Sequence, residues 1–176
     1  MQKEKIITSI LKIAMSSILI LTALPVSTGS AVKWYSFDEG LALAKKTKKP
    51  ILIDFTAQWC RYCLLMDKNT FSNPTISQKL NKHFIPIRID VDVKANIINF
   101  RGRKFSHKEF FGAIGGTALP TVVFIDNKGE FITKVPGYIK KNIFLPLLKY
   151  IEKKCYLSKT PFDKNYIEGK SNCKNK

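Results

Sequence analysis

An apolar, β-branched run at residues 51–56 constrains this chain more than any other feature, because two cysteines follow it almost at once. The run predicts a buried strand, and residues 63–66 are typical of a helix. A thiol at this strand-to-helix turn lies at the positive end of the helix dipole, which favours its thiolate form. A second thiol three residues on shares the helix face and can attack a mixed disulfide. We therefore predict an exchanging redox pair, with Cys60 as the exposed nucleophile and Cys63 as the resolving thiol.

Other uses of a CxxC pair fit this sequence less well. Attachment of c-type haem requires a histidine directly after the second cysteine, and position 64 is leucine. A structural zinc site needs four ligands, whereas His83 and His107 are isolated and are expected to be surface or capping residues. A purely structural disulfide closes too short a loop to gain much chain entropy, although the spacing permits it. We expect no metal and no cofactor.

The order of predicted elements gives the fold class. A capping-box pattern at residues 36–39 starts a helix, and Asn73 with Pro74 starts another that ends near Phe84. We expect residues 94–116 to be helical with a basic loop, and a last helix to begin near Asn142 with Pro146 in its first turn. Strands are expected at residues 51–56, 85–91, 121–125 and 131–135, the last two as a hairpin. The chain is therefore predicted to be α/β, with a central mixed β-sheet flanked by helices on both faces.

Residues 1–31 have the three-part layout of a secretory signal peptide. A short basic start precedes the uncharged residues 13–24, and small residues offer a cleavage site after Ala31. A retained membrane anchor is the alternative, but a helix of twelve residues spans only about 18 Å of a hydrocarbon core of roughly 30 Å. We expect an exported protein of the periplasm or cell envelope, with one domain at residues 32–154 and a basic tail at residues 155–176.

Export sets the chemistry expected of the four cysteines, because disulfides persist in an oxidising compartment. Four cysteines allow three pairings, and adjacency favours Cys60 with Cys63 and Cys155 with Cys173. The second pair is expected to be a structural disulfide that pins an otherwise loose, lysine-rich tail.

The strongly basic composition does not by itself identify a partner. The chain carries a formal net charge of +17, and removal of residues 1–31, with three lysines and one glutamate, leaves +15. Such a surface attracts acidic partners, but the lysines are spread along the chain and form no nucleic-acid-binding signature. We expect a monomer that does not bind nucleic acid.

Several segments in the same order resemble the thioredoxin family. Residues 37–151 are most similar to one branch of it, the C-terminal thioredoxin-like domain of the thiol:disulfide interchange protein DsbD. Residues 100–112 are extra relative to that branch, and the tail has no counterpart in it. The segments that carry the resemblance are LIDF, the WCxxC at residues 59–63, NTFSNP at residues 69–74, QKL at residues 78–80, LPTVVFID at residues 119–126, and Gly137.

The resemblance implies roles for several further residues. Asp54 takes the place of the buried carboxylate that exchanges a proton with the resolving cysteine, and Asp67 that of a second acidic residue near the pair. Leu119 and Pro120 take the place of the cis-proline segment that pairs with an extended substrate. The environment of the cysteines also includes Trp59, Arg61, Tyr62 and Lys68, of which Arg61, Tyr62 and Lys68 depart from the usual thioredoxin pattern.

Together these observations predict an exported thiol–disulfide oxidoreductase that reduces disulfides of protein substrates. Its electrons would come from another thiol protein, and this donor could be located in the membrane. A disulfide oxidase or isomerase, a thioredoxin of cytochrome c maturation, and a redox-silent binding module are the alternatives.

Overall fold

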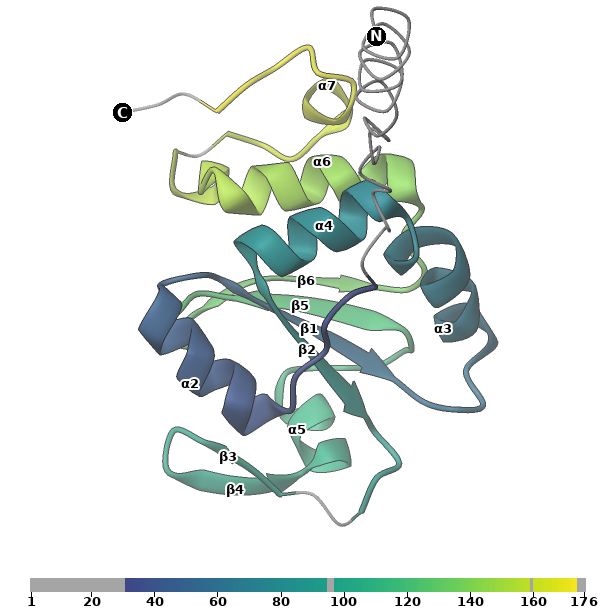
Figure 1. Cartoon of the computed structure of the whole chain (residues 1–176), viewed down its shortest axis with the longest axis vertical. Helices are drawn as coiled ribbons and strands as arrows, with labels where there is room; N and C mark the ends of the chain where they lie inside the picture. The colour runs from purple at the N-terminus through teal and green to yellow at the C-terminus, as the bar shows by residue number, and fades with distance from the viewer. Residues whose placement is uncertain (1–30, 95–96, 159, 174–176) are drawn as a thin grey trace, which may run out of the picture.

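The computed structural model describes residues 31–94, 97–158 and 160–173, and a four-stranded mixed sheet lies at its centre (Figure 1). The strand order is β2-β1-β5-β6. Strand β1 is parallel to β2, whereas β5 is antiparallel to both β1 and β6. The strands are β1 (Ile51–Thr56), β2 (Ile85–Asp90), β5 (Thr121–Ile125) and β6 (Phe131–Pro136). The predicted signal peptide lies outside the described residues, apart from Ala31.

Helices cover both faces of the sheet, which confirms the predicted fold class (Figure 1). Because side chains alternate along β1, Ile53 and Phe55 face one apolar cluster and Leu52 faces the other. The first cluster is closed by α2 (Phe37–Thr47) and by α5 (His107–Ala113). The second is closed by α3 (Arg61–Met66), the π-helical turn η1 (Asp67–Phe71), α4 (Pro74–His83) and α6 (Lys141–Glu152).

The capping signals predicted from the sequence are present. Ser36 and Glu39 form the capping box of α2. The side chain of Asn73 accepts from the N–H groups of Thr75 and Ile76, with Pro74 in the first turn of α4. These bonds satisfy amide groups that have no partner inside their helices, so local sequence sets both starting points.

The expectation of interrupted helix at residues 94–116 is wrong for its first half. Residues 97–106 form a β-hairpin of β3 (Ile97–Phe100) and β4 (Arg103–Ser106), and only α5 after it is helical. Arg101 and Gly102 both have positive φ, of 54° and 76°. A two-residue turn of this kind matches the twist of paired strands. The aromatic ring of Phe100 then packs on Phe37 and Phe110, a tertiary contact that periodicity cannot reveal.

The last helix begins at Lys141, within one residue of the predicted start near Asn142. The expected position of the proline is wrong, because Pro146 lies inside the helix rather than in its first turn. Proline lacks the N–H that would bond to the carbonyl of Asn142. Burial of Phe144 and Leu148 in the second apolar cluster offsets that loss.

The tail is folded against α6 rather than loose. It contains the 3₁₀ turn η2 (Cys155–Ser158) and the short helix α7 (Lys164–Ile167). Tyr150 of α6 contacts the rings of Phe162 and Tyr166, with centroids 5.3 and 5.1 Å away, and its hydroxyl donates to the Thr160 carbonyl at 2.6 Å. A disulfide joins Cys155 and Cys173 across this segment.

We predict that Cys173→Ser, made in a Cys60→Ser/Cys63→Ser background, lowers the free energy of unfolding by about 1–3 kcal/mol. The upper value is the chain entropy of closing a loop of this size, and the aromatic contacts of the tail reduce the loss. Guanidinium denaturation measures the change. Adding dithiothreitol to the background protein should produce the same shift, and an unchanged midpoint in both experiments would contradict the prediction.

Candidate functional site

The cysteine pair lies where β1 gives way to α3. Cys60 and Cys63 are joined by a disulfide, with Cα atoms 5.2 Å apart. Cys60 is the N-cap of α3, and its Sγ accepts the backbone N–H of Cys63 at 3.1 Å. Each cysteine is only 4% exposed, so in this disulfide form exposure does not distinguish the two. Their positions in the helix distinguish them, because Cys60 receives a helix N–H at its sulfur and Cys63 does not.

The helix of the cysteines continues without a break into η1. Asp67, the first residue of this π-helical turn, lies four residues after Cys63. A π-helical turn changes the direction of the residues that follow it relative to the preceding helix. From this turn the carboxylate of Asp67 reaches the side chain of Arg88 in β2.

Asp54 is a buried carboxyl group in the middle of the central strand. It lies between Arg88 of β2 and Val122 of β5 in the register of the sheet, and it is 2% exposed. Burial raises the pKa of Asp54 to about 6, although Arg88 acts to lower this pKa and the charge of Asp67 acts to raise it. Asp54 shares its strand face with Leu52, so it points to the side of the sheet that α3 and η1 cover.

Arg88 links the two predicted acidic residues and was not identified from the sequence. Its Nε donates to Asp54 Oδ2 at 2.9 Å, and its terminal nitrogens donate to both carboxylate oxygens of Asp67. The guanidinium also lies over the Trp34 ring, with Cζ 4.0 Å from the centroid. Arg88 therefore ties the helix of Cys63 to the strand of Asp54.

An arginine between two isoleucines in the strand at residues 85–90 was the available signal for Arg88. Its partners depend on the parallel register Asp54↔Arg88, which is tertiary information.

Aromatic and aliphatic side chains are exposed around the cysteines. Trp59 is 71% exposed, and its indole Nε1 donates to Asp92 Oδ2 at 2.6 Å. Tyr62 and Leu64, on the first turn of α3, are also exposed, as is Arg61. This surface can meet a polypeptide partner, because large apolar side chains in contact with water gain from being covered.

The predicted substrate-binding segment directly precedes β5. The peptide bond between Leu119 and Pro120 is cis, and the Pro120 carbonyl accepts the N–H of Gly137 at 2.7 Å. Leu119 packs against the same apolar cluster that contains both cysteines. The fold thus brings this segment, distant in sequence, to the cluster of the redox pair.

The two histidines have different surroundings. His83 contacts Glu152, with Nδ1 2.9 Å from Oε1, and His107 is buried rather than on the surface or capping a helix, which corrects the expectation for that residue. Within residues 31–94, 97–158 and 160–173, no three His, Cys, Asp or Glu side chains are grouped so that they could hold a metal ion.

A cysteine pair at a helix N-terminus, set at the end of a central strand in a β2-β1-β5-β6 sheet, defines a thiol–disulfide oxidoreductase of the thioredoxin fold. Residues 37–152 match the family model of the thioredoxin-like domain. The chain belongs to this family, as the sequence resemblance predicted.

Individual proteins show how far the similarity extends. The thiol:disulfide interchange protein DsbD of Campylobacter jejuni strain RM1221 is 36% identical over 104 residues, which are 59% of this chain and 16% of that protein. The chain therefore spans less than a fifth of such curated relatives. A thioredoxin-fold protein from Helicobacter pylori superposes with a TM-score of 0.58 at 21% identity, covering 70% of this chain and 80% of that one. A DsbH oxidoreductase superposes with a TM-score of 0.58 at 21% identity, covering 81% of this chain and 98% of that one. Both structures share the fold.

No helix in the part of the chain that the structure describes is long and apolar enough to cross a bilayer.

We predict that the stability of the disulfide form falls as pH rises through the pKa of Asp54. Since the folded-state pKa of about 6 lies above the ordinary value of 3.8, protonation favours the folded state. The contribution is complete below pH 3.8 and is lost as pH rises through 6, by on the order of 3 kcal/mol. Urea denaturation between these pH values measures it.

Two variants serve as controls for that prediction. Asp54→Asn should remove this part of the pH dependence. Arg88→Gln should shift the loss to higher pH, because it removes the charge that lowers the Asp54 pKa. An Asp54→Asn protein with the unaltered pH profile would show that another group is responsible.

Proposed function

We propose that this protein is an exported reductant of disulfides in polypeptide substrates. The observation that carries the proposal is the buried carboxyl of Asp54, tied through Arg88 to the helix of Cys63. A fold and a CxxC pair admit several directions of exchange, whereas negative charge near the pair favours one of them.

The first step is attack by the Cys60 thiolate on a substrate disulfide. One substrate sulfur forms a bond to Cys60 Sγ, the substrate S–S bond breaks, and the other substrate sulfur leaves as a thiolate. The N–H of Cys63, which lies 3.1 Å from Cys60 Sγ, stabilises the attacking thiolate. The exposed side chains of Trp59 and Tyr62, together with the segment of Leu119 and Pro120, would hold the substrate strand.

The second step releases the substrate. Asp54 takes the proton of the Cys63 thiol, and the resulting thiolate attacks Cys60 Sγ. The mixed disulfide breaks, the second substrate sulfur leaves as a thiolate, and the Cys60–Cys63 disulfide forms. The substrate has gained two electrons, which a donor thiol protein must restore to the pair.

Charge near the pair supports the proposed direction of transfer. Carboxylates near the pair destabilise the cysteine thiolates, which disfavours the reduced form and makes the protein a better reductant. Asp54 and Asp67 act in this sense, whereas Arg61 and Arg88 act in the opposite one. Because Arg88 bonds to both carboxylates, these three side chains carry one net negative charge when both carboxyl groups are ionised. Asp54 is only 2% exposed, whereas Arg61 is exposed and its charge is screened by solvent. We therefore expect the charge of Asp54 to affect the cysteine thiolates more than that of Arg61 does.

The redox potential of the Cys60–Cys63 pair tests the proposal most directly. Equilibration with a glutathione series should give a value near that of thioredoxin, about −270 mV. A value near that of DsbA, about −120 mV, would make the protein a disulfide oxidase. Failure to reduce insulin would favour a redox-silent binding module.

Export, domain limits and partners belong to the same proposal. Residues 1–31 would act as the signal peptide, residues 32–154 as the redox domain and residues 155–176 as a basic extension. In the envelope the protein would act as a monomer on disulfide-bearing proteins and draw electrons from a thiol protein there.

We predict that Cys63→Ala traps mixed disulfides with substrates, whereas Cys60→Ala abolishes exchange. Only Cys60 has a helix N–H directed at its sulfur, so it is the attacking thiol. Non-reducing gels of each variant incubated with a disulfide-bearing protein reveal the adducts. Adducts formed by the Cys60→Ala variant instead would reverse the two roles.

We also predict that Asp54→Asn makes the Cys60 thiolate more abundant at neutral pH and slows substrate release. Loss of the negative charge favours the thiolate, and loss of the base leaves Cys63 slower to attack. Thiolate absorbance at 240 nm and stopped-flow resolution kinetics measure the two effects. Asp67→Asn, which removes a half-exposed carboxylate, is the matched control and should act in the same direction but more weakly.

A further inference from the structure

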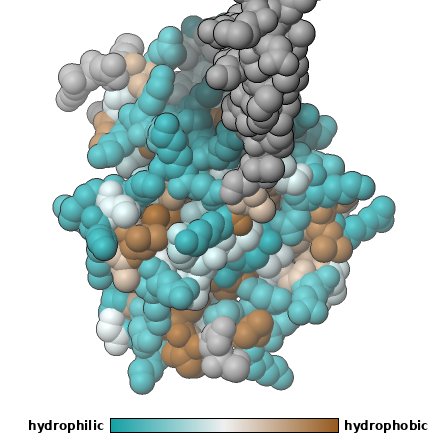
Figure 2. All heavy atoms as spheres, viewed as in Figure 1, coloured by the Kyte–Doolittle hydropathy of each residue, from teal (hydrophilic) through white to brown (hydrophobic). Residues whose placement is uncertain are grey.

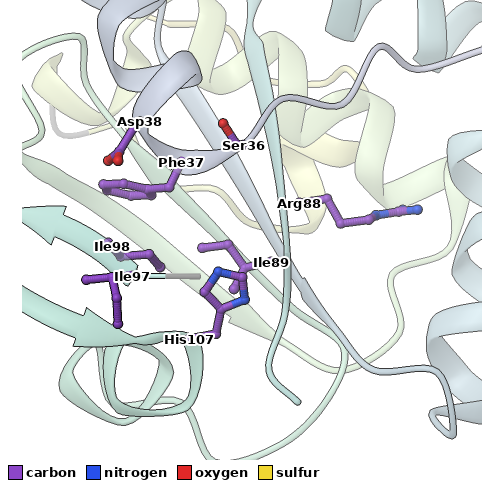
Figure 3. Close-up of a pocket in the computed structure, with 8 residues that line it drawn as sticks. All are labelled: Ser36, Phe37, Asp38, Arg88, Ile89, Ile97, Ile98 and His107. Atoms are coloured by element: carbon purple, nitrogen blue, oxygen red, sulfur yellow. The ribbon is translucent and has the colours of Figure 1, made fainter. Parts of the chain in front are cut away.

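A pocket that neither Cys60 nor Cys63 lines lies between the start of α2, the end of β2 and the β3–β4 hairpin (Figure 3). Its volume is about 410 Å³. Cavities of about 150 Å³ already hold a benzene ring, so a substituted or bicyclic aromatic molecule fits this one. The residues that line it are Ser36, Phe37, Asp38, Arg88, Ile89, Ile97, Ile98 and His107.

The wall of the pocket has an apolar part, formed by Phe37 and three isoleucines, and a polar part, formed by Ser36, Asp38, Arg88 and His107. Phe37, Ile89 and Ile98 are buried, whereas Ile97 at the rim is 49% exposed. In the space-filling view the apolar atoms on this face form small groups among hydrophilic ones, and one group lies at the end formed by the hairpin and α5 (Figure 2). Covering Ile97 and filling the space beside Phe37 would favour binding of an apolar ligand.

His107 supplies a polar group with a defined role inside this wall. It is 8% exposed, and its Nδ1 lies 2.7 Å from the Asp90 carbonyl oxygen. A carbonyl oxygen only accepts, so Nδ1 carries the proton and Nε2 of the neutral ring is an acceptor. Among the described residues Nε2 has no hydrogen-bond partner. Figure 3 shows the far edge of the ring directed toward Phe37 and Ile98, into the pocket.

The other polar groups of the pocket leave acceptors rather than donors available. The Ser36 hydroxyl donates to Glu39 at 2.6 Å, and the Arg88 guanidinium points away to its carboxylate partners (Figure 3). Asp38 is exposed at the rim and forms no ion pair within the described part of the chain. In a protein with a net charge of +17, this pocket therefore does not suit an anion.

We infer that this pocket binds an aromatic ring that carries an O–H or N–H donor, with the ring against Phe37 and the three isoleucines and the donor bonded to His107 Nε2. A phenol or indole has this chemistry, whether it is free or is the side chain of a tyrosine or tryptophan in a polypeptide. Arg88 is the one residue that this pocket shares with the candidate redox site, and its guanidinium points away from the pocket, so binding here can be tested separately from the proposed reduction.

Methyl NMR of the isoleucines in the disulfide-bonded protein tests this inference. Titration with p-cresol should shift the methyl signals of Ile89, Ile97 and Ile98 in a saturable manner. Toluene, which lacks the donor, should bind about three- to tenfold more weakly, the effect of one net neutral hydrogen bond. A Gly-Tyr-Gly peptide that shifts the same signals supports a polypeptide source, and shifts with p-cresol alone support a free small molecule.

Two variants make the test specific. Ile97→Lys places a charge at the rim and should abolish the shifts, whereas Leu157→Lys, at an exposed apolar residue of η2, should leave them unchanged. His107→Phe should bind p-cresol and toluene with equal affinity. If this variant fails to fold, the comparison of Ile97→Lys with Leu157→Lys still tests whether the ligand binds in this pocket. No saturable shifts, shifts only of isoleucine methyls outside the pocket, or equal affinity of the unaltered protein for the two probes would each overturn the inference.

Discussion

A single ion pair in the middle of the sheet constrains much of this structure. A carboxyl group at position 54 of a buried strand costs several kcal/mol unless a partner compensates for the lost hydration. Arg88 is that partner, and it can reach Asp54 only because β2 pairs in parallel with β1 in one register. Its guanidinium needs cover in turn, which Trp34 and Phe71 provide.

The same arginine connects the central sheet to the segment that carries the cysteine pair. By holding Asp67 as well as Asp54, it connects the sheet to the helix that begins at Cys60. The raised pKa of Asp54 results mainly from burial, with the charge of Asp67 acting in the same direction and Arg88 against them. A group with a pKa of about 6 can both lose and accept a proton near neutral pH, as transfer from a resolving thiol requires.

Local patterns predicted most of the elements but not their partners. The cap at Asn73, the capping box at Ser36 and the strand at residues 51–56 were predicted correctly because each depends on neighbours in sequence. The β3–β4 hairpin was missed because its short strands depend on packing of Phe100 against Phe37 and Phe110. Arg88 was missed for a related reason, since nothing near it in sequence shows that Asp54 and Asp67 are its partners.

The sequence by itself determined the α/β class, the family and the redox pair, because strand period, helix caps and CxxC spacing act over a few residues. Only the tertiary structure decided that Arg88 bridges the two carboxylates, that the tail packs on α6, and that His107 faces a pocket beside Phe37. Each of these contacts joins elements far apart in the chain. Their geometry depends on strand register and on how helices pack over the sheet, which no local pattern encodes.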